Sequence, residues 1–142
     1  MRLLPATNVL SEVTRPRPDT HALQWLDSLD EDRSFISVVS IAEIRRGGAL
    51  MASGRKRDAL AEWLTQDLPQ RFEQRVIPVD EPVAIACGDL MGFAKRSGRG
   101  LSSMDGLIAA TAIAHDLTLA IRNIKDFEGF GIELVDPWTE RP

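Results

Sequence analysis

The chain has 142 residues, a hydrophobic fraction of 44%, a charged fraction of 27% and a net charge of −4. These values predict one globular domain over residues 1–142, long enough to enclose a hydrophobic core. The negative net charge excludes a basic surface over the whole protein of the kind that binds nucleic acid. Cys87 is the single cysteine, so an intrachain disulfide is excluded as well. No apolar run is long enough to cross a bilayer and no signal peptide is visible, so we expect a cytoplasmic protein without a membrane partner.

Short apolar runs alternate with helical patterns along the chain. In order, we expect a strand at 2–6, helices at 9–14 and 21–29, a strand at 35–38, a helical hairpin from about 39 to 68, a strand at 76–79, helices at 81–96 and 103–115, and strands at 117–121 and 132–135. Pro5 is unusual inside a strand, and Pro69 is expected to follow the end of the hairpin. Strands that alternate with single or paired helices predict an α/β fold, with three layers (α/β/α) around a mainly parallel central sheet.

The segment from Ser102 to His115 is the most apolar part of the chain. Because almost no polar side chain interrupts it, we expect a helix that is buried on all sides. Ser102 or Ser103 can cap its start, which places Asp105 in the first turn. A carboxylate is favoured there by the unpaired amide groups and by the helix dipole.

Three acids with apolar neighbours are candidates for a shared site: Glu43, Asp105 and Asp126. Parallel sheets form their sites beyond the carboxyl ends of the strands, where these residues are expected to meet. Several carboxylates in one pocket need a neutralising cation, and an all-oxygen site suits Mg²⁺ or Mn²⁺ better than zinc. Taken one at a time, the same acids fit plainer roles as a helix-start residue, an exposed glutamate and a turn residue.

Basic residues fall into short runs. Arg45-Arg46 and Arg55-Lys56-Arg57 are expected to lie on solvated faces. Lys95, Arg96 and Arg99 precede the helix that carries Asp105 and are weak candidates for contact with a phosphate backbone. The two histidines lack metal-ligand spacing, and Cys87 is expected to be a small core residue.

Four segments in order resemble a known family: residues 7–12 (TNVLSE), 40–47 (SIAEIRRG), 103–110 (SMDGLIAA) and 122–127 (RNIKDF). They look like the four motifs of PIN-domain ribonucleases, and they are most similar to the VapC and FitB type toxins of bacterial type II toxin–antitoxin systems. The resemblance covers essentially the whole chain. It implies a PIN-like fold, an endoribonuclease activity that depends on Mg²⁺ or Mn²⁺, a homodimer, and inhibition by a small antitoxin protein.

The resemblance also implies roles for individual residues. By motif, Glu43 and Asp105 are metal-site acids with catalytic roles. The last motif supplies its acid at the position of Asn123 or at that of Asp126, and only Asp126 is a carboxylate here. Ala6, Thr7, Asn8 and Asn123 are then expected to line the site.

The chain departs from the family pattern at three positions. Ala6 stands where the family has an aspartate that binds metal, Pro5 replaces an aliphatic strand residue, and Ile121 replaces a Thr or Ser. A methyl group cannot coordinate a cation, so we expect a weak or inactive nuclease whose activity returns with Ala6→Asp. A laboratory substitution and a natural loss of activity both explain Ala6. The alternative function is a non-catalytic PIN-fold module that binds an antitoxin or RNA.

Overall fold

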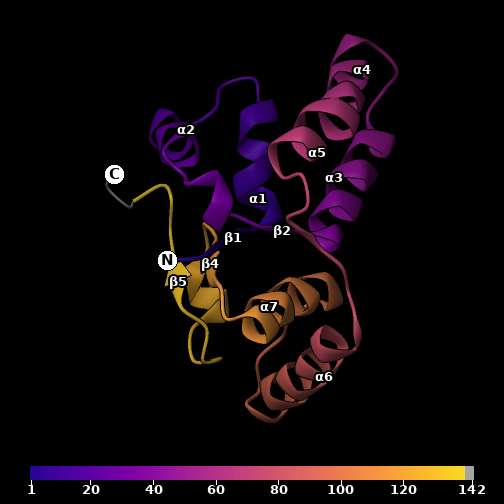
Figure 1. The fold of residues 1–142 in the computed structure, drawn as a ribbon. Coiled ribbons are helices and arrows are strands. Elements are labelled where there is room, and N and C mark those ends of the chain that lie inside the picture. Colours follow the sequence, from indigo (N-terminus) through magenta and orange to yellow (C-terminus); the bar gives the residue numbers. More distant parts are fainter. Residues whose placement is uncertain (140–142) are drawn as a thin grey trace.

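The computed structural model describes residues 1–139, and the last three residues of the expected 1–142 domain lie outside this description (Figure 1). Five short strands form its centre: β1 (Leu3–Pro5), β2 (Ile36–Ser37), β3 (Val76–Ile77), β4 (Thr118–Ala120) and β5 (Leu134–Val135). All pairings are parallel, in the orders β1-β4-β5 and β2-β3, and a single bridge from Leu3 to Ser34 joins the two groups. The strands therefore follow one another in the order β3-β2-β1-β4-β5, which places β1 in the middle.

Pro5 explains why the two groups of strands are joined so sparsely. The amide of Ala6 donates to the carbonyl of Ala120, toward β4. Because neighbouring amides in a strand point to opposite sides, the nitrogen of Pro5 faces β2, where it has no hydrogen to donate. Proline is thus accommodated in a central strand because the ladder on that side has already ended.

The helical elements are α1 (Thr7–Leu10), η1 (Ser11–Thr14), α2 (Thr20–Asp27), η2 (Glu31–Arg33), α3 (Val38–Leu50), α4 (Arg55–Glu62), η3 (Trp63–Asp67), α5 (Leu68–Arg71), α6 (Glu81–Arg96), α7 (Ser103–His115) and η4 (Ile124–Phe127). Figure 1 shows α6 and α7 on one side of the sheet and α1 to α5 on the other. Alternate residues of β4 serve the two layers, since Leu119 packs in the α6–α7 cluster and Ala120 packs with Val9 and Trp25 of α1 and α2. The expected three-layer α/β/α fold with a parallel sheet is confirmed.

Several helix boundaries differ from the expected ones. The first helix of the expected hairpin, α3, begins at Val38, and Ser37 caps it by accepting a hydrogen bond from the amide of Val39 at 3.0 Å. Helical structure also continues past Pro69 to Arg71, because a π-helical turn, η3, comes directly before α5. The π-helical turn is wider than an α-helical one and changes the backbone hydrogen-bond pattern, so the missing N–H of Pro69 does not end the helix.

The helix α7 is less enclosed than its composition predicts. Ser102 caps it, and its residues from Ile108 to Ala112 are buried between the sheet and α6. Ile113, however, is 39% exposed, so the expectation of burial on all sides is wrong. The reason is that α6 and the sheet cover only two sides of the helix. No helix within residues 1–139 is long and apolar enough to span a membrane.

Candidate functional site

A cavity of about 280 Å³ lies at the carboxyl ends of β1 and β4. Its lining residues come from five separate parts of the chain: Ala6, Thr7, Asn8, Ser11, Glu43, Asp105, Ile108, Ile121 and Phe127. The parallel sheet creates this arrangement, because residue 6 directly follows β1 and residue 121 directly follows β4. Glu43 lies on α3 and Asp105 lies on α7, and these two helices bring both carboxylates to the cavity.

Glu43 is held in place by a hydroxyl group. The Thr7 hydroxyl donates to Oε1 of Glu43 at 2.6 Å, and Thr7 Oγ1 also lies 3.0 Å from the hydroxyl oxygen of Ser40. Ser40 is fully buried and sits one helical turn before Glu43 on α3. Since the hydrogen bond joins the first residue of α1 to α3, it fixes the carboxylate relative to the central strand.

Asp105 occupies the first turn of α7, as expected. Its backbone amide donates to the Ser102 hydroxyl at 3.1 Å, so the helix cap is provided by serine and not by the aspartate. Within residues 1–139, no group donates a hydrogen bond to the Asp105 carboxylate, which is half-buried at the cavity. Its oxygens are therefore available to a ligand.

Ala6 lies between these acids and the sheet. Its residue is 3% exposed, and its carbonyl accepts hydrogen bonds from the amides of Val9 and Leu10, where it forms the N-cap of α1. No side chain caps α1. The side chain of residue 6 thus projects a methyl group into a cavity that holds two carboxylates, in the place where the family pattern has a third.

Asp126 and Asn123 lie outside the cavity lining. Both are exposed, beside or within η4, and only Phe127 of that turn reaches the cavity. The turn is anchored through its backbone, because Arg99 donates to the carbonyls of Lys125 and Asp126 at 3.1 Å and 3.0 Å. The carboxylate of Asp126 is left pointing to solvent.

Arg99 itself is engaged in holding this loop. Besides the two carbonyls of η4 it contacts the carbonyl of Glu128, and its guanidinium lies 4.1 Å from the centre of the Phe130 ring. Lys95 and Arg96 are exposed in the last turn of α6, where cations also suit the helix dipole. Of the three residues expected to contact phosphate, Lys95 and Arg96 therefore project into solvent, whereas Arg99 is occupied within the fold.

The donor set at the cavity fits a hard divalent cation. Glu43 and Asp105 supply carboxylates and Asn8 supplies an amide group, while the Thr7 hydroxyl holds Glu43, so the groups available to a ligand offer oxygen. Mg²⁺ commonly binds one or two protein carboxylates and completes its shell with water and substrate phosphate. No three side chains of the His, Cys, Asp and Glu types come together as a metal site within residues 1–139.

Four residues that the structure brings to this region lie within the quoted motif segments but were assigned no site role: Ser11, Ser40, Ile108 and Phe127. Helical spacing was a further signal for two of them. Ser40 is three residues before Glu43, and Ile108 is three residues after Asp105, so each shares a helix face with its acid.

Comparison with known proteins places this site in context. The sequence profile of the PIN domain matches residues 4–131. Toxin FitB of Neisseria gonorrhoeae is 39% identical over 138 residues, covering 97% of this chain and 99% of that protein. VapC ribonuclease Y4jK of Sinorhizobium fredii is 36% identical over 132 residues, covering 93% and 94%.

Solved structures give the same result. A chain in the crystal structure of FitAcB from Neisseria gonorrhoeae aligns with a TM-score of 0.91 at 38% identity, covering 97% of this chain and 99% of that one. A chain of FitAB bound to an IR36 DNA fragment aligns with a TM-score of 0.90 at 36% identity, covering 99% and 98%. The fold is shared further with VapBC2 from Rickettsia felis, at a TM-score of 0.79 and 24% identity over 96% and 98% of the two chains.

Proposed function

Because the chain belongs to the PIN-domain family, we propose that it is the toxin of a type II toxin–antitoxin module, an endoribonuclease dependent on Mg²⁺ or Mn²⁺ that Ala6 impairs. One observation carries the proposal. Ala6, Glu43 and Asp105, which are far apart in the sequence, line one cavity at the edge of a parallel sheet. The chemistry of this site is suited to a phosphodiester only when a cation offsets its negative charge.

Glu43 and Asp105 would hold the cation. When bound, a divalent ion supplies an activated water and offsets the charge that develops on the phosphodiester. The protein contributes the positions of its own groups: Thr7 orients the Glu43 carboxylate through the 2.6 Å hydrogen bond. The apolar side chains of Ile108, Ile121 and Phe127 exclude water from one wall of the cavity, which strengthens electrostatic interactions inside it.

Asp126 remains the proposed third acid of the set, and Asn123 a proposed lining residue. Support comes from the neighbouring Phe127, which lines the cavity from the same short turn. The Asp126 carboxylate would have to turn inward from its exposed position. In the Ala6→Asp background, Asp126→Asn is therefore expected to reduce cleavage less than Glu43→Gln or Asp105→Asn. Equal loss of cleavage in all three variants would instead mean that Asp126 contributes as much to cleavage as Glu43 and Asp105.

The deciding experiment restores the carboxylate. Ala6→Asp is expected to produce RNA cleavage that requires Mg²⁺ or Mn²⁺, whereas the uncharged Ala6→Asn control and the original chain cleave weakly or not at all. In the absence of metal, Ala6→Asp should also lower the melting temperature, because it places a third carboxylate beside Glu43 and Asp105. Added Mn²⁺ should recover that loss, whereas it should not affect Ala6→Asn. A folded Ala6→Asp variant that cuts no RNA would overturn the enzyme assignment.

A second candidate function is a non-catalytic module that binds an antitoxin or RNA. The methyl group of Ala6 and the apolar Ile121 in the cavity favour it. This function requires tight binding that chelators do not change, together with the absence of a growth defect on expression even after Ala6→Asp. Expression of both chains side by side separates the two functions, since only a nuclease gains toxicity from the substitution.

The proposed partner is a small antitoxin that acts with this chain in the cytoplasm. Support comes from the solved relatives, whose structures are described as FitAcB, FitAB and VapBC2. Co-expression of this chain with the protein encoded beside it, followed by size-exclusion chromatography, tests the pairing. A neighbouring protein that elutes separately would count against it.

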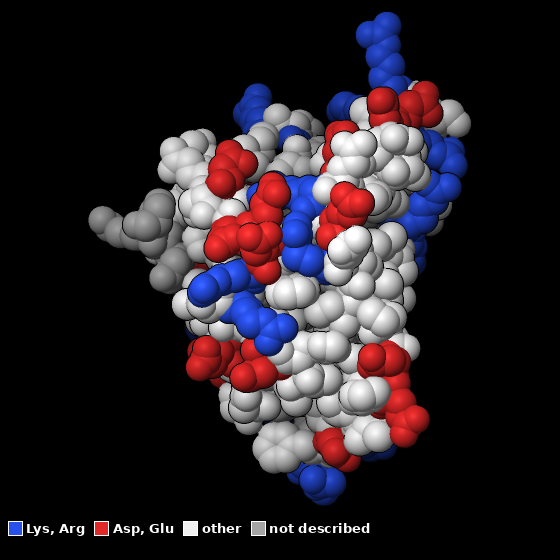
Figure 2. All heavy atoms as spheres, in the orientation of Figure 1, with Lys and Arg blue, Asp and Glu red and all other residues white. Residues whose placement is uncertain are grey.

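We also propose a homodimer that forms through α6. Ile85 and Phe93 on this helix are 59% and 44% exposed and, with Ile113 of α7, border an apolar hollow of about 520 Å³. In Figure 2 the surface over α7 is mostly uncharged, and charged side chains lie around it toward α6. Acids at the start of α6 and cations at its end would pair if two copies packed antiparallel. Ile85→Glu should therefore give a monomer in sedimentation analysis, and an unchanged dimer would exclude this face.

A further inference from the structure

The hairpin of α3 and α4 is basic, although the whole chain is acidic. Residues 38–62 hold five cations, Arg45, Arg46, Arg55, Lys56 and Arg57, against three acids, Glu43, Asp58 and Glu62. Figure 2 shows Lys and Arg side chains gathered along the outer edge of this hairpin, at the upper right. The net charge of −4 thus conceals a local positive surface.

The placement of these cations is unfavourable for the helix that carries them. Arg55, Lys56 and Arg57 occupy the first turn of α4, at the positive end of its dipole, and Gly54 provides no side-chain cap. Cations are normally favoured at the opposite end of a helix. Asp58 in the same turn offsets these three cations only in part, and a local preference that is broken in this way is typical of a functional surface.

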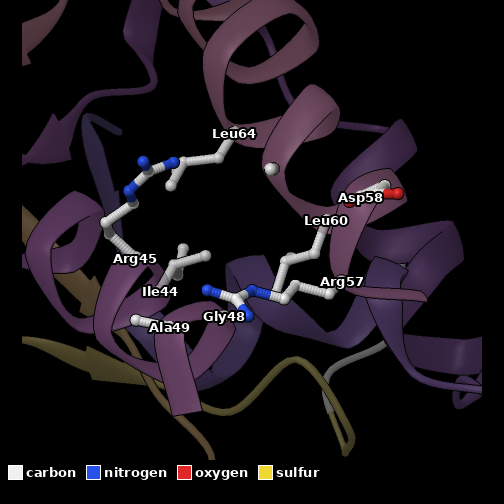
Figure 3. A pocket seen from close by; sticks show the side chains of 9 residues that line it. Ile44, Arg45, Gly48, Ala49, Arg57, Asp58, Leu60 and Leu64 are labelled. Carbon is white, nitrogen blue, oxygen red and sulfur yellow. The ribbon is translucent and has the colours of Figure 1, made fainter. Parts of the chain in front are cut away.

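Two of these arginines meet at one cavity. Arg45 of α3 and Arg57 of α4 line a space of about 130 Å³ between the helices, beside Leu60 and Leu64 (Figure 3). Figure 3 shows both guanidinium groups extending to the rim of this space from different helices. Asp58 also borders it, yet its carboxylate is not within ion-pair distance of either arginine.

Both guanidinium groups also lack hydrogen-bond partners in the part of the chain that the structure describes. The ion pairs found there are Arg15 with Glu12 and Arg33 with Asp30. By contrast, Arg71, Arg75 and Arg99 each donate to backbone carbonyls. The pair at the hairpin therefore has unused donors, whereas the arginines that support the fold do not.

We propose that Arg45 and Arg57 form a subsite for a backbone phosphate of RNA, separate from the cavity at Glu43, with Arg46, Arg55 and Lys56 extending it along the strand. The guanidinium group matches phosphate in planar, bidentate geometry, and two converging groups can hold one phosphate from both sides. A row of fixed positive charge fits a polyanion better than a single acidic side chain. The subsite rests on the proposed ribonuclease function, because it would hold the substrate of that activity.

The position on α3 connects the subsite to the acidic cavity. Glu43 and Arg46 are three residues apart and share a helix face, while Arg45 turns toward α4. A strand that leaves the cavity at Glu43 can therefore pass over Arg46 before it reaches Arg45 and Arg57. The subsite would bind a phosphate on the flank of the cleaved bond, which raises affinity for RNA without taking part in the chemistry.

Binding to RNA in EDTA tests this directly, because cleavage is silent without metal. The probe is a fluorescein-labelled oligouridine, with unfractionated tRNA as a second ligand. The variants are Arg45→Gln/Arg57→Gln and the control Arg2→Gln/Arg33→Gln, which removes the same charge from exposed residues before β1 and β2. The hairpin variant should bind at least about tenfold more weakly. Its slope of log affinity against log salt should fall by about 0.7, since the two arginines together hold one phosphate and each phosphate contact contributes about 0.7. The control should retain affinity and slope.

A second measurement keeps the result independent of any RNA sequence. Inorganic phosphate should raise the melting temperature of the original chain and should have less effect on Arg45→Gln/Arg57→Gln. The hairpin variant itself should be no less stable, because it relieves repulsion between cations. Equal RNA affinity and equal salt slope in the two double variants would overturn the proposed subsite. The proposal would also be overturned if polyglutamate displaced the labelled oligouridine as well as unlabelled oligouridine does. Failure of Ala6→Asp to cleave RNA would overturn the proposed nuclease but would leave these binding results standing.

Discussion

The hydroxyl of Thr7 and the carboxylate of Glu43, which are separated by 35 residues of chain, are joined by a hydrogen bond of 2.6 Å at the candidate site. Hydrogen bonds to charged groups are stronger than neutral ones, so this contact orients the carboxylate before any ligand arrives. Thr7 begins α1 directly after residue 6, which makes the orientation of Glu43 depend on the end of the central strand.

Thr7 is therefore expected to tune metal affinity without binding the metal itself. In the Ala6→Asp background, Thr7→Val removes the hydroxyl but keeps the shape, and it should weaken Mn²⁺ binding by about 10–100-fold, the usual effect of losing a group that orients a ligand. Thr7→Ser keeps the hydroxyl and should bind nearly as well as its parent. Calorimetric titration with Mn²⁺ measures both, and equal affinities for the Val and Ser variants would remove this role.

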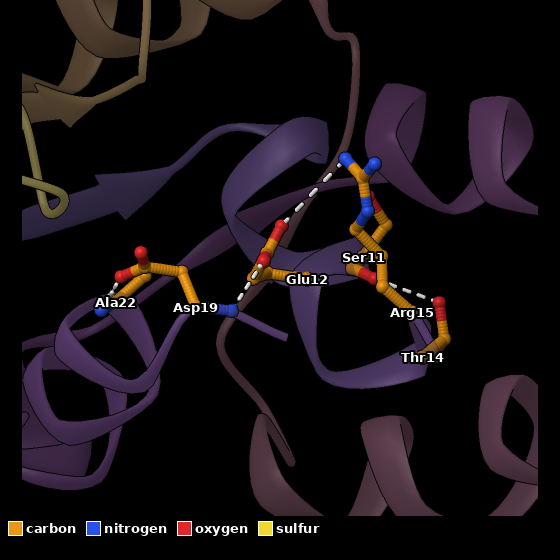
Figure 4. Close-up of polar contacts among 6 residues, drawn as sticks. All are labelled: Ser11, Glu12, Thr14, Arg15, Asp19 and Ala22. Atoms are coloured by element: carbon orange, nitrogen blue, oxygen red, sulfur yellow. Dashed lines mark hydrogen bonds and ion pairs between the residues drawn. The ribbon is translucent and has the colours of Figure 1, made fainter. Parts of the chain in front are cut away.

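Glu12 is a buried acid with a structural task (Figure 4). It is 4% exposed; its Oε2 accepts from the amide of Asp19 at 2.7 Å, and Asp19 in turn caps α2 by accepting from the amide of Ala22. Glu12→Ala leaves the Asp19 amide without its acceptor, which should cost about 1–3 kcal/mol of stability. Urea unfolding measures the loss. Glu12→Gln keeps an acceptor and should lose less, while the exposed Glu31→Ala should change little.

Gly106 allows α6 to lie close against α7. A Cβ at this position would come within 2.5 Å of Met91 Sδ and 3.6 Å of Cys87 Sγ. Gly106→Ala should therefore destabilise the fold, because overpacking typically costs about 1–3 kcal/mol and the gain in helix propensity is only up to about 1 kcal/mol. Gly88→Ala is the matched control on α6: it is exposed and meets nothing within 4 Å, so it should be slightly stabilising. Thermal unfolding of both variants is the measurement, and stabilisation by both would contradict this view of the helix contact.

Cys87 should react slowly with alkylating reagents. Burial raises the pKa of its thiol, so the fraction of reactive thiolate near neutral pH is smaller than for a free cysteine. The folded state is favoured while the thiol is neutral, and this advantage is lost as the pH rises through the raised pKa. Alkylation by iodoacetamide should be slower in the folded protein than in guanidinium and should accelerate at alkaline pH. Equal rates in both states would show that the thiol is freely accessible.

Much of the architecture follows from the sequence because periodicity reports burial. The strand at 118–120 and the helix at 81–96 lie where their apolar patterns place them. The gathering of Thr7, Glu43 and Asp105 follows as well, since strand ends of a parallel sheet share one edge. These parts depend on the chain's local pattern together with a general rule of topology.

Other parts depend on contacts that no local pattern reports. Asp126 is exposed in η4, and Arg99, from another part of the chain, anchors the backbone of that turn. The shared cavity of Arg45 and Arg57 arises from the way that α4 packs on α3, so the sequence showed only two separate basic runs. Extension of the helix beyond Pro69 likewise needs the π turn before it, which has no simple sequence signal.

The backbone of residue 6 makes all of its hydrogen bonds without help from the side chain: its amide pairs with Ala120, and its carbonyl receives the first turn of α1. Exchange of alanine for aspartate at this position therefore leaves every backbone partner of the sheet and of α1 in place. Residue 6 is an interchangeable part: its side chain can change the charge of the cavity while the surrounding architecture stays as it is.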